Sequence, residues 1–199
     1  TNFDAIIGVV DYSFDEYAIL PRSLDDIQSE STVTEVSVDH IDSWNMVSLP
    51  LSVDNASQLA LFPNSVDGTL YGFDGTYYNA AELLSGPGYW LFFNDAGSDV
   101  LSGAAVNSIT ISLVPGWNMI GSITQELDIN AIVDPSEIIV EGTVYGFNGT
   151  YWNPTTLTPG KGYWINASSG GEITLSSGSA KIRSNQSNPL SKSNFISFN

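Results

Sequence analysis

Apolar and polar residues alternate along much of the chain with the two-residue period of β-strands. The alternation is clearest where Ile109, Ile111 and Leu113 are separated by Thr110 and Ser112. Such a pattern is typical of a strand that buries one of its two faces. Segments of this kind are short and are separated by Gly, Pro, Asn, Asp and Ser. The pattern therefore predicts the all-β class, with short strands joined by turns.

The same pattern occurs twice along the chain. Three sequence blocks of the first half return in the second half in the same order, 73 or 74 residues later: Trp44-Asn45-Met46-Val47 as Trp117-Asn118-Met119-Ile120, Leu70–Asn79 as Val144–Asn153, and Gly86–Trp90 as Gly160–Trp164. Nearly constant spacing across three blocks indicates an internal duplication. We place the first copy at residues 33–106 and the second at residues 107–180, and we predict two tandem sandwich- or barrel-like repeats.

Each copy is expected to contain the same series of elements. A strand precedes the tryptophan and a second strand follows it, and a short helical turn comes next, at 54–61 or 128–133, with Asp54 or Asn55 as its cap in the first copy. The dipeptides Asp74-Gly75 and Asn148-Gly149 predict two-residue hairpin turns. A Gly-x-Gly corner then leads into a Tyr-Trp strand, and its glycines are expected to adopt backbone angles closed to other residues.

Two terminal segments match neither copy. Residues 1–32 contain an apolar stretch and an acidic aromatic stretch, and residues 181–199 are rich in Ser and Asn but end in an alternating segment. We predict unpaired terminal strands, which would complete the open sheet edge of a neighbouring molecule and build a homo-oligomer or polymer. The candidate assembly residues are Ile6, Ile7, Val9, Val10, Phe195, Ile196 and Phe198.

Charge and composition exclude several kinds of partner. Hydrophobic residues make up 42% of the chain and charged residues 14%, a balance typical of a folded protein. The 22 acidic and 5 basic residues give a formal charge of −17, which repels nucleic acid. No apolar run is long enough to insert into a membrane. Because the chain begins at Thr1, we expect a processed product or a piece of a longer protein.

Candidate catalytic residues are few. The chain has no cysteine, which excludes disulfides, thiolate zinc sites and thiol nucleophiles. The only histidine, His40, aligns with Leu113 and is expected to be a structural residue at a strand end. A glycosidase needs two carboxylates across a cleft, but Asp74 aligns with Asn148 and Glu82 with Thr156. We therefore predict a non-enzymatic protein.

Calcium is the only cofactor that the acidic loops favour, because Ca²⁺ is bound by several oxygen ligands. The candidate carboxylates are Asp25, Asp26, Asp39, Asp42, Asp95 and Asp99. None of them reproduces the spacing of an EF-hand, and solvated surface charge is the more common explanation of such residues. No other cofactor or metal site is expected.

The aromatic residues carry the remaining binding hypothesis. The pairs Trp44/Trp117 and Trp90/Trp164 match between the copies, as the core of a duplicated fold would. The adjacent pairs Tyr77-Tyr78 and Tyr151-Trp152 differ, because neighbouring residues of a strand face opposite sides. Tyr78 and Trp152 are the candidates for a surface that stacks on sugar rings or forms a protein interface, and solvent-facing cross-strand pairing is the more common role of such rings.

The combination of Trp-Asn-Met, Tyr-Gly-Phe-x-Gly-x-Tyr and Gly-x-Gly-Tyr-Trp resembles a tandem β-repeat module of large exported, cell-surface proteins in type IX-secreting and related bacteria. The resemblance covers residues 33–180 and implies an extracellular location and a structural or adhesive role. It implies no catalytic residue. The sequence thus predicts a non-enzymatic extracellular module that assembles into a filament or surface layer by strand addition. The alternative is a polysaccharide-binding module of a larger secreted enzyme.

Overall fold

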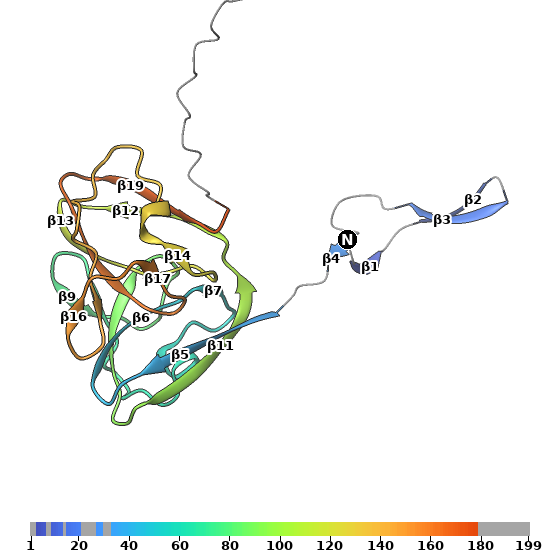
Figure 1. Ribbon diagram of the computed structural model, residues 1–199. Helices are drawn as coiled ribbons and strands as arrows, with labels where there is room; N and C mark the ends of the chain where they lie inside the picture. Colours follow the sequence, from blue (N-terminus) through green and yellow to red (C-terminus); the bar gives the residue numbers. More distant parts are fainter. Residues whose placement is uncertain (1–2, 7–8, 14, 21–26, 30–32, 179–199) are drawn as a thin grey trace, which may run out of the picture.

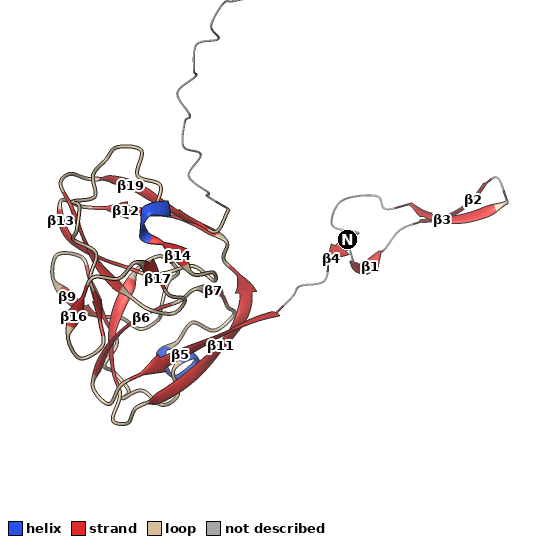
Figure 2. Ribbon diagram, in the orientation of Figure 1, coloured by secondary structure: helices blue, strands red, loops and turns tan. Residues whose placement is uncertain are grey.

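The computed structural model describes residues 3–6, 9–13, 15–20, 27–29 and 33–178, and it confirms the all-β prediction (Figures 1 and 2). The first copy contains the strands β5 (Val33–His40), β6 (Trp44–Ser48), β7 (Leu51–Ser52), β8 (Tyr71–Phe73), β9 (Tyr77–Asn79), β10 (Gly88–Phe92) and β11 (Gly97–Ala105), with one helical turn, α1 (Gln58–Leu61). These strands form two sheets, ordered β6-β10-β8-β9 and β5-β11-β7.

The second copy repeats this arrangement with strands of equal or shorter length. Its elements are β12 (Ser108–Leu113), β13 (Gly116–Ile120), β14 (Leu127–Asp128), η2 (Ile129–Ala131), β15 (Gly146–Phe147), β16 (Tyr151–Trp152), β17 (Thr156–Leu157), β18 (Tyr163–Ala167) and β19 (Gly171–Ser176). The pairs β12–β19, β13–β18 and β15–β16 correspond to β5–β11, β6–β10 and β8–β9 of the first copy. A bridge between Tyr145 and Trp164 joins the hairpin to β18, as Tyr71 joins Trp90 in the first copy.

The N-terminal segment differs from the prediction of an unpaired strand. The apolar stretch is divided between β1 (Phe3–Ile6), which pairs with β4 (Ile27–Ser29), and β2 (Val9–Ser13), which pairs with β3 (Glu16–Leu20). A tight turn between β2 and β3 makes the second pairing possible. Asp15 adopts a φ of 64° there and accepts a hydrogen bond of 3.0 Å from the Tyr12 hydroxyl. The acidic aromatic segment therefore folds back on the apolar stretch.

The asparagine of each Trp-Asn-Met block holds the preceding turn closed. The Asn45 side chain accepts from the Ile41 N–H at 3.0 Å and donates to the Ile41 and Ser43 carbonyls at 2.9 Å. Asn118 makes the same three bonds, to Val114 and Gly116, at 2.8–3.0 Å. A side-chain amide offers both the donors and the acceptor that such a turn needs. This residue is therefore part of the scaffold.

The helical turns and hairpins follow the sequence prediction with two changes. Asp128 caps η2 by accepting from the Asn130 N–H at 2.7 Å, whereas α1 begins after Ser57, without a side-chain cap. The hairpin loops hold three residues rather than two, because Phe73 pairs with Tyr77. Gly75 and Gly149 adopt φ values of 105° and 98° in these loops, which explains the glycine in each.

Each copy has its own hydrophobic core. The first core gathers Val38, Val47, Leu49, Leu51, Phe62, Leu70, Leu83, Tyr89, Leu91, Phe93 and Leu101, and the second gathers Ile111, Ile120, Ile123, Leu127, Leu157, Tyr163, Ile165, Ile173 and Leu175, with further residues around both. A third cluster contains Met46 of the first copy and Met119 and Trp164 of the second. This third cluster lies between the copies, so they share a packed junction.

Backbone hydrogen bonds cross this junction in matching pairs. The Ser48 N–H donates to the Gly160 carbonyl at 2.8 Å, and the Gly121 N–H donates to the Gly86 carbonyl at 2.6 Å. Ser48 is equivalent to Gly121, and Gly86 is equivalent to Gly160, so exchanging the copies converts one bond into the other. An approximate twofold axis therefore relates the two copies. Strand bridges extend across it as well, from Val47 to Lys161 and from Pro87 to Ile120.

The two glycines of each Gly-x-Gly corner have different roles. Gly86 and Gly160 adopt φ values of 107° and 80°, as the sequence predicted. Gly88 and Gly162 instead lie where the backbones of the two copies approach closely. A Cβ at Gly88 would come within 2.6 Å of the Ile120 carbonyl oxygen, and one at Gly162 within 2.8 Å of the Val47 carbonyl oxygen. Glycine is required there because the junction leaves no room for a side chain.

Candidate binding surface

The structure contradicts the core prediction for one pair of tryptophans. Trp44 and Trp117 are 38% and 44% exposed, whereas Trp164 is only 9% exposed and Trp90 is half-buried. Trp44 is the first residue of β6 and Trp117 is the second residue of β13. Each side chain points away from the core of its own copy. Both rings pack on neighbouring rings, Trp44 on Tyr71 and Trp117 on Tyr145, and leave a large apolar area exposed at matched positions.

These tryptophans belong to a surface that we call the aromatic cradle. It consists of two adjacent pockets, each of about 490 Å³. One is lined by Phe73, Tyr77, Trp117, Tyr145, Tyr151 and Trp164, and the other by Trp44, Tyr71, Tyr77, Trp90, Phe147 and Tyr151. Tyr77 and Tyr151 line both pockets and therefore lie between them. Each pocket combines residues of both copies, so neither copy contains a complete pocket by itself.

The two pockets are related by the approximate twofold axis, and their geometry agrees closely. The Phe73 and Trp164 rings meet edge to face at 4.9 Å and 81°, and their equivalents Phe147 and Trp90 meet at 5.0 Å and 77°. Within the hairpins, Phe73 lies 5.2 Å from Tyr77, and Phe147 lies 5.1 Å from Tyr151. These edge-to-face contacts fix the ring orientations before any ligand arrives.

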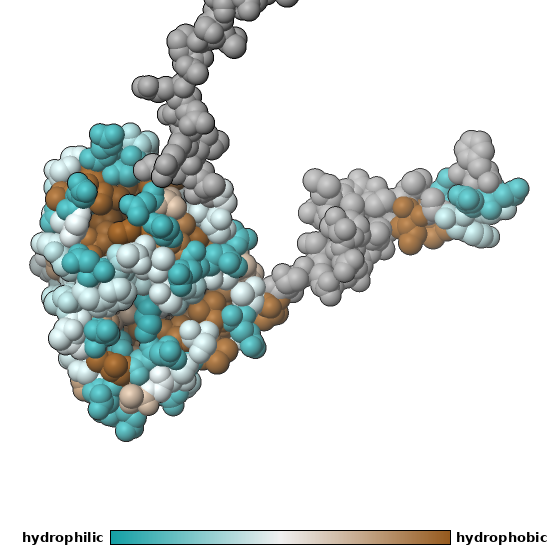
Figure 3. Space-filling model, viewed as in Figure 1, coloured by the Kyte–Doolittle hydropathy of each residue, from teal (hydrophilic) through white to brown (hydrophobic). Residues whose placement is uncertain are grey.

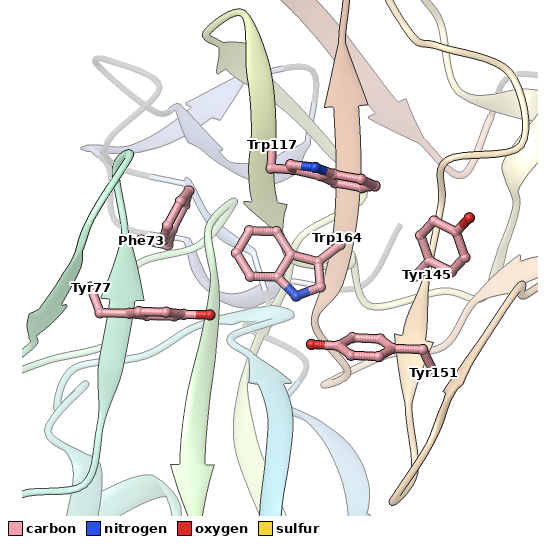
Figure 4. A pocket seen from close by; sticks show the side chains of 6 residues that line it. All are labelled: Phe73, Tyr77, Trp117, Tyr145, Tyr151 and Trp164. Carbon is pink, nitrogen blue, oxygen red and sulfur yellow. The ribbon is translucent and has the colours of Figure 1, made fainter.

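Figure 4 shows how the rings surround the first pocket. Trp164 presents its face at the back, with Trp117 on one side, and the hydroxyl ends of Tyr77 and Tyr151 converge on the opposite side. The pocket thus offers ring faces in several orientations together with polar edges. Within the described part of the chain, the hydroxyls of Tyr77 and Tyr151 and the indole N–H of Trp117 make no hydrogen bond. These donors are available to a ligand.

Charge is excluded from the cradle lining. All ten lining side chains are Trp, Tyr or Phe, although the chain as a whole carries a formal charge of −17. A cationic or anionic ligand would find no opposite charge in these pockets, and the acidic protein would repel an anion. The cradle therefore favours an uncharged ligand with apolar faces and hydroxyl or carbonyl edges.

Tyr78 and Trp152, the stacking residues expected from the sequence, lie elsewhere. Both are 42% exposed, but neither lines a pocket. Each ring covers the glycine opposite it on the neighbouring strand, Tyr78 over Gly72 and Trp152 over Gly146. The preceding residues, Tyr77 and Tyr151, point into the cradle instead. In each hairpin, the ring that pairs with a glycine lies on one face, and the tyrosine before it lies on the face toward the cradle. The pairing with glycine therefore distinguishes the two faces of the hairpin.

His40 lies in a buried polar cluster at the outer end of the first copy. It stacks on Phe93 at 3.8 Å, and its Nε2 lies 3.5 Å from the Asp99 carboxylate. The other carboxylate oxygen of Asp99 accepts from the Asn64 amide at 2.6 Å. The burial of His40 and its stacking on Phe93 support the structural interpretation of this residue.

The calcium hypothesis concerns carboxylates that the structure does not bring together. Among the described residues, no group of three or more His, Asp or Glu side chains could hold a metal ion. Asp99 is buried beside His40, and Asp39 and Asp42 lie on exposed positions of the same copy. Asp25 and Asp26 lie outside the described residues. Among the helices of the described part, none is long and apolar enough to cross a membrane.

The candidate assembly residues are only partly described. Ile6 lies in β1, and Val9 and Val10 lie in β2 with exposed fractions of 59% and 63%. Figure 3 shows apolar surface at the base of this hairpin. Ile7, Phe195, Ile196 and Phe198 lie outside the described residues.

Three ionisable side chains, the buried Tyr89 and Tyr163 and the half-buried Lys161, have shifted pKa values. Burial raises the pKa of the Tyr89 and Tyr163 phenols, and the hydrogen bonds that their oxygens accept from the Leu84 and Thr158 N–H groups oppose this in part. Burial at the junction lowers the pKa of Lys161, and Asp39 opposes the shift. The Lys161 ammonium donates to the Asp39 carbonyl across the junction. None of the three is a cradle residue.

Comparison with protein-family models, curated proteins and solved structures finds no match for this chain.

Proposed function

We propose that this chain is a non-catalytic carbohydrate-binding module with an adhesive role in an exported, cell-surface protein. The observation that supports the proposal is the aromatic cradle. Each of its five pairs of equivalent residues keeps the same residue type in both copies: Trp44/Trp117, Tyr71/Tyr145, Phe73/Phe147, Tyr77/Tyr151 and Trp90/Trp164. Exposed aromatic rings contribute less to folding than buried ones. A ligand is the simplest reason for keeping the four exposed rings, Trp44, Trp117, Tyr77 and Tyr151. The rings Phe73, Trp90, Tyr145, Phe147 and Trp164 also pack in the cluster between the copies.

A neutral sugar chain fits the chemistry of the cradle. The axial C–H groups of a pyranose ring form an apolar face that packs on an aromatic ring, and its hydroxyls accept from indole N–H and phenol O–H groups. A volume of about 490 Å³ per pocket lies within the usual range for small-molecule sites, about 300–1,000 Å³. The absence of charge among the lining residues favours neutral glycans over uronic acids and sulfated glycans.

Strand addition has less support as the main function. In the described part of the N-terminal segment, each strand already has a partner, β1 with β4 and β2 with β3. The C-terminal candidate strand lies outside the described residues. Assembly therefore stays a sequence-based hypothesis, and we do not base the proposed function on it.

The test is binding to insoluble and soluble polysaccharides. The protein is mixed with cellulose, xylan, mannan and laminarin, with polygalacturonate as the anionic comparison, and the bound fraction is measured by co-sedimentation or affinity electrophoresis. We expect retention by at least one neutral polymer and none by polygalacturonate. The variant Trp44→Ala/Trp117→Ala should lose this binding by on the order of 10²-fold or more, because each large aromatic anchor contributes about 2 kcal/mol.

A matched control comes from the other face of the same hairpins. Tyr78 and Trp152 are as exposed as Trp44 and Trp117 but lie outside both pockets. The variant Tyr78→Ala/Trp152→Ala should bind like the unmodified protein once both are shown to fold by thermal unfolding. Loss of binding in this variant with full binding in the tryptophan variant would contradict the proposal.

A further inference from the structure

We infer that the cradle is one site that binds a single neutral sugar chain across both pockets, in either chain direction. The inference rests on the proposed function and adds how the ligand lies. It follows from two features of the geometry, the shared wall between the pockets and the approximate twofold axis that relates them.

The shared wall makes the two pockets adjacent. Tyr77 and Tyr151 each line both pockets, so a ligand that leaves one pocket over these rings enters the other directly. In Figure 4 the hydroxyls of Tyr77 and Tyr151 point toward one another from the two copies. A sugar chain that crosses between the pockets would pass over this pair of hydroxyls. The hydroxyls can donate to the glycosidic and ring oxygens of the sugar and accept from its hydroxyl groups.

Occupation of both pockets by one chain is favoured by effective concentration. Once one sugar unit is held in the first pocket, the next units are confined close to the second pocket and bind without a further loss of overall translation. Two independent short ligands would each lose that freedom. A chain long enough to reach both pockets should therefore bind more tightly than a short one by on the order of 10²-fold.

The twofold relation removes the preference for one chain direction. A sugar chain has a reducing and a non-reducing end, and rotation about the axis exchanges those ends while it exchanges the pockets. Both pockets have the same ring types, and their edge-to-face contacts agree within 0.1 Å and 4° for the Phe73–Trp164 and Phe147–Trp90 pairs. The cradle therefore offers the same ring types to a sugar chain and to its reverse, and the two pockets differ beside the outer tryptophans, where Trp44 packs on Phe92 and Trp117 on Trp164. A module of this kind can bind a sugar chain in either orientation on the same surface.

Isothermal titration calorimetry of the whole chain tests the spanning. The probes are cello-, xylo-, manno- and laminari-oligosaccharides from the disaccharide to the hexasaccharide, and a proline-rich peptide as a different class of polymer. We expect one hexasaccharide per protein and an affinity that rises with length by on the order of 10²-fold. The single variants Trp44→Ala and Trp117→Ala should each reduce the hexasaccharide affinity to about that of the short sugars, and by equal factors.

A spin label tests the direction. A hexasaccharide with a nitroxide at its reducing end should broaden the indole N–H signals of Trp44 and Trp117 to the same extent in NMR spectra. Broadening of one of the two would contradict binding in either direction. Two hexasaccharides per protein, with an affinity independent of length, would overturn spanning but leave the proposed function intact. Binding of the proline-rich peptide and of no sugar, or of no probe at all, would overturn both.

Discussion

The aromatic cradle and the buried cluster around His40 differ in how far the two copies have diverged. Four of the ten cradle rings, Trp44, Trp117, Tyr77 and Tyr151, are exposed, and the five pairs of equivalent residues are all the same residue type. The cluster at His40 is buried, and its equivalents are different: His40 becomes Leu113, Asp99 becomes Ile173 and Phe93 becomes Ala167. Folding therefore tolerates large changes inside each copy, whereas the solvent-facing aromatic rings have remained fixed.

This difference separates two physical constraints. A core accepts any set of side chains that fills its volume without an unpaired polar group. An exposed ring is not held by such packing rules, and in water its apolar surface is a cost rather than a gain. Packing at the junction accounts for the buried Trp164 and for the rings packed against its cluster. The four exposed rings, Trp44, Trp117, Tyr77 and Tyr151, are the ones for which the proposed ligand supplies a constraint from outside the chain. Core packing and the cradle also depend on one another, because both pockets exist only when the two copies pack together at the junction.

The largest effect is expected from adding a side chain where the backbones of the two copies meet at the junction. Gly162→Ala would place a Cβ 2.8 Å from the Val47 carbonyl oxygen, and the backbone of both copies would have to shift. We expect a loss of about 3 kcal/mol in the free energy of unfolding, measured by chemical denaturation, together with loss of ligand binding. Gly88→Ala should act in the same way, since its Cβ would lie 2.6 Å from the Ile120 carbonyl oxygen.

Gly178→Ala is the control for these variants, because a Cβ there meets nothing within 4 Å and the residue has no positive φ. It should leave stability and binding unchanged. A junction variant that keeps full stability would show that the two copies are not held together as the structure has them.

A smaller effect is expected from exchanging the buried cluster for its equivalent in the second copy. His40→Leu alone leaves the Asp99 carboxylate buried without its neighbour and should reduce the free energy of unfolding by about 2 kcal/mol. The double variant His40→Leu/Asp99→Ile copies Leu113 and Ile173 and should recover most of that loss. A double-mutant cycle by urea denaturation measures the coupling. Additive losses would contradict the view that this end of the fold is freely exchangeable.

The smallest stability effect is expected from the two buried phenols. Tyr89→Phe and Tyr163→Phe remove the acceptors of the Leu84 and Thr158 N–H groups, and each should reduce the free energy of unfolding by about 1 kcal/mol at neutral pH. Ligand binding should not change, because neither residue lines the cradle. A tenfold loss of binding in either variant would show that the scaffold and the cradle are not separable.

The same phenols predict a dependence on alkaline pH. Their folded-state pKa values are raised above the ordinary value of 10.0, so folding favours the neutral form. The stability that they contribute is fully present below pH 10.0 and is lost as the pH rises through the raised values. The double variant Tyr89→Phe/Tyr163→Phe should therefore lose less stability than the unmodified protein above pH 10.0. Tyrosinate absorbance, followed with pH, measures when these phenols ionise.

Much of the fold was predictable because it is encoded locally. Period-two alternation identified the strands, and the Asp-Gly and Asn-Gly dipeptides identified both hairpins, although their loops hold one residue more than expected. The asparagine of the Trp-Asn-Met block bonds only to residues two and four positions before it. Interactions of such short range follow from sequence spacing alone.

The cradle was not predictable because it is made by two distant segments. Matched tryptophans at Trp44 and Trp117 are typical of a duplicated core, and the sequence does not show that the twofold junction turns them toward a shared surface. The same reason explains the choice of Tyr78 over Tyr77, since alternation shows that the two rings face opposite sides but not which side meets the other copy. The closed N-terminal hairpin was missed because it depends on the positive φ of Asp15.

The most direct test of the cradle uses the tryptophans as reporters. The chain has five, of which Trp44, Trp90, Trp117 and Trp164 line the cradle and Trp152 lies on the other face of the hairpin. Isotope labelling of the indoles gives one N–H signal for each in NMR spectra, and the signals are followed as a retained neutral oligosaccharide is added. We expect the four cradle signals to move with one common dissociation constant while the Trp152 signal stays in place. Movement of the Trp152 signal alone, or bound sugar with all four cradle signals unchanged, would contradict the assignment of the cradle as the binding surface.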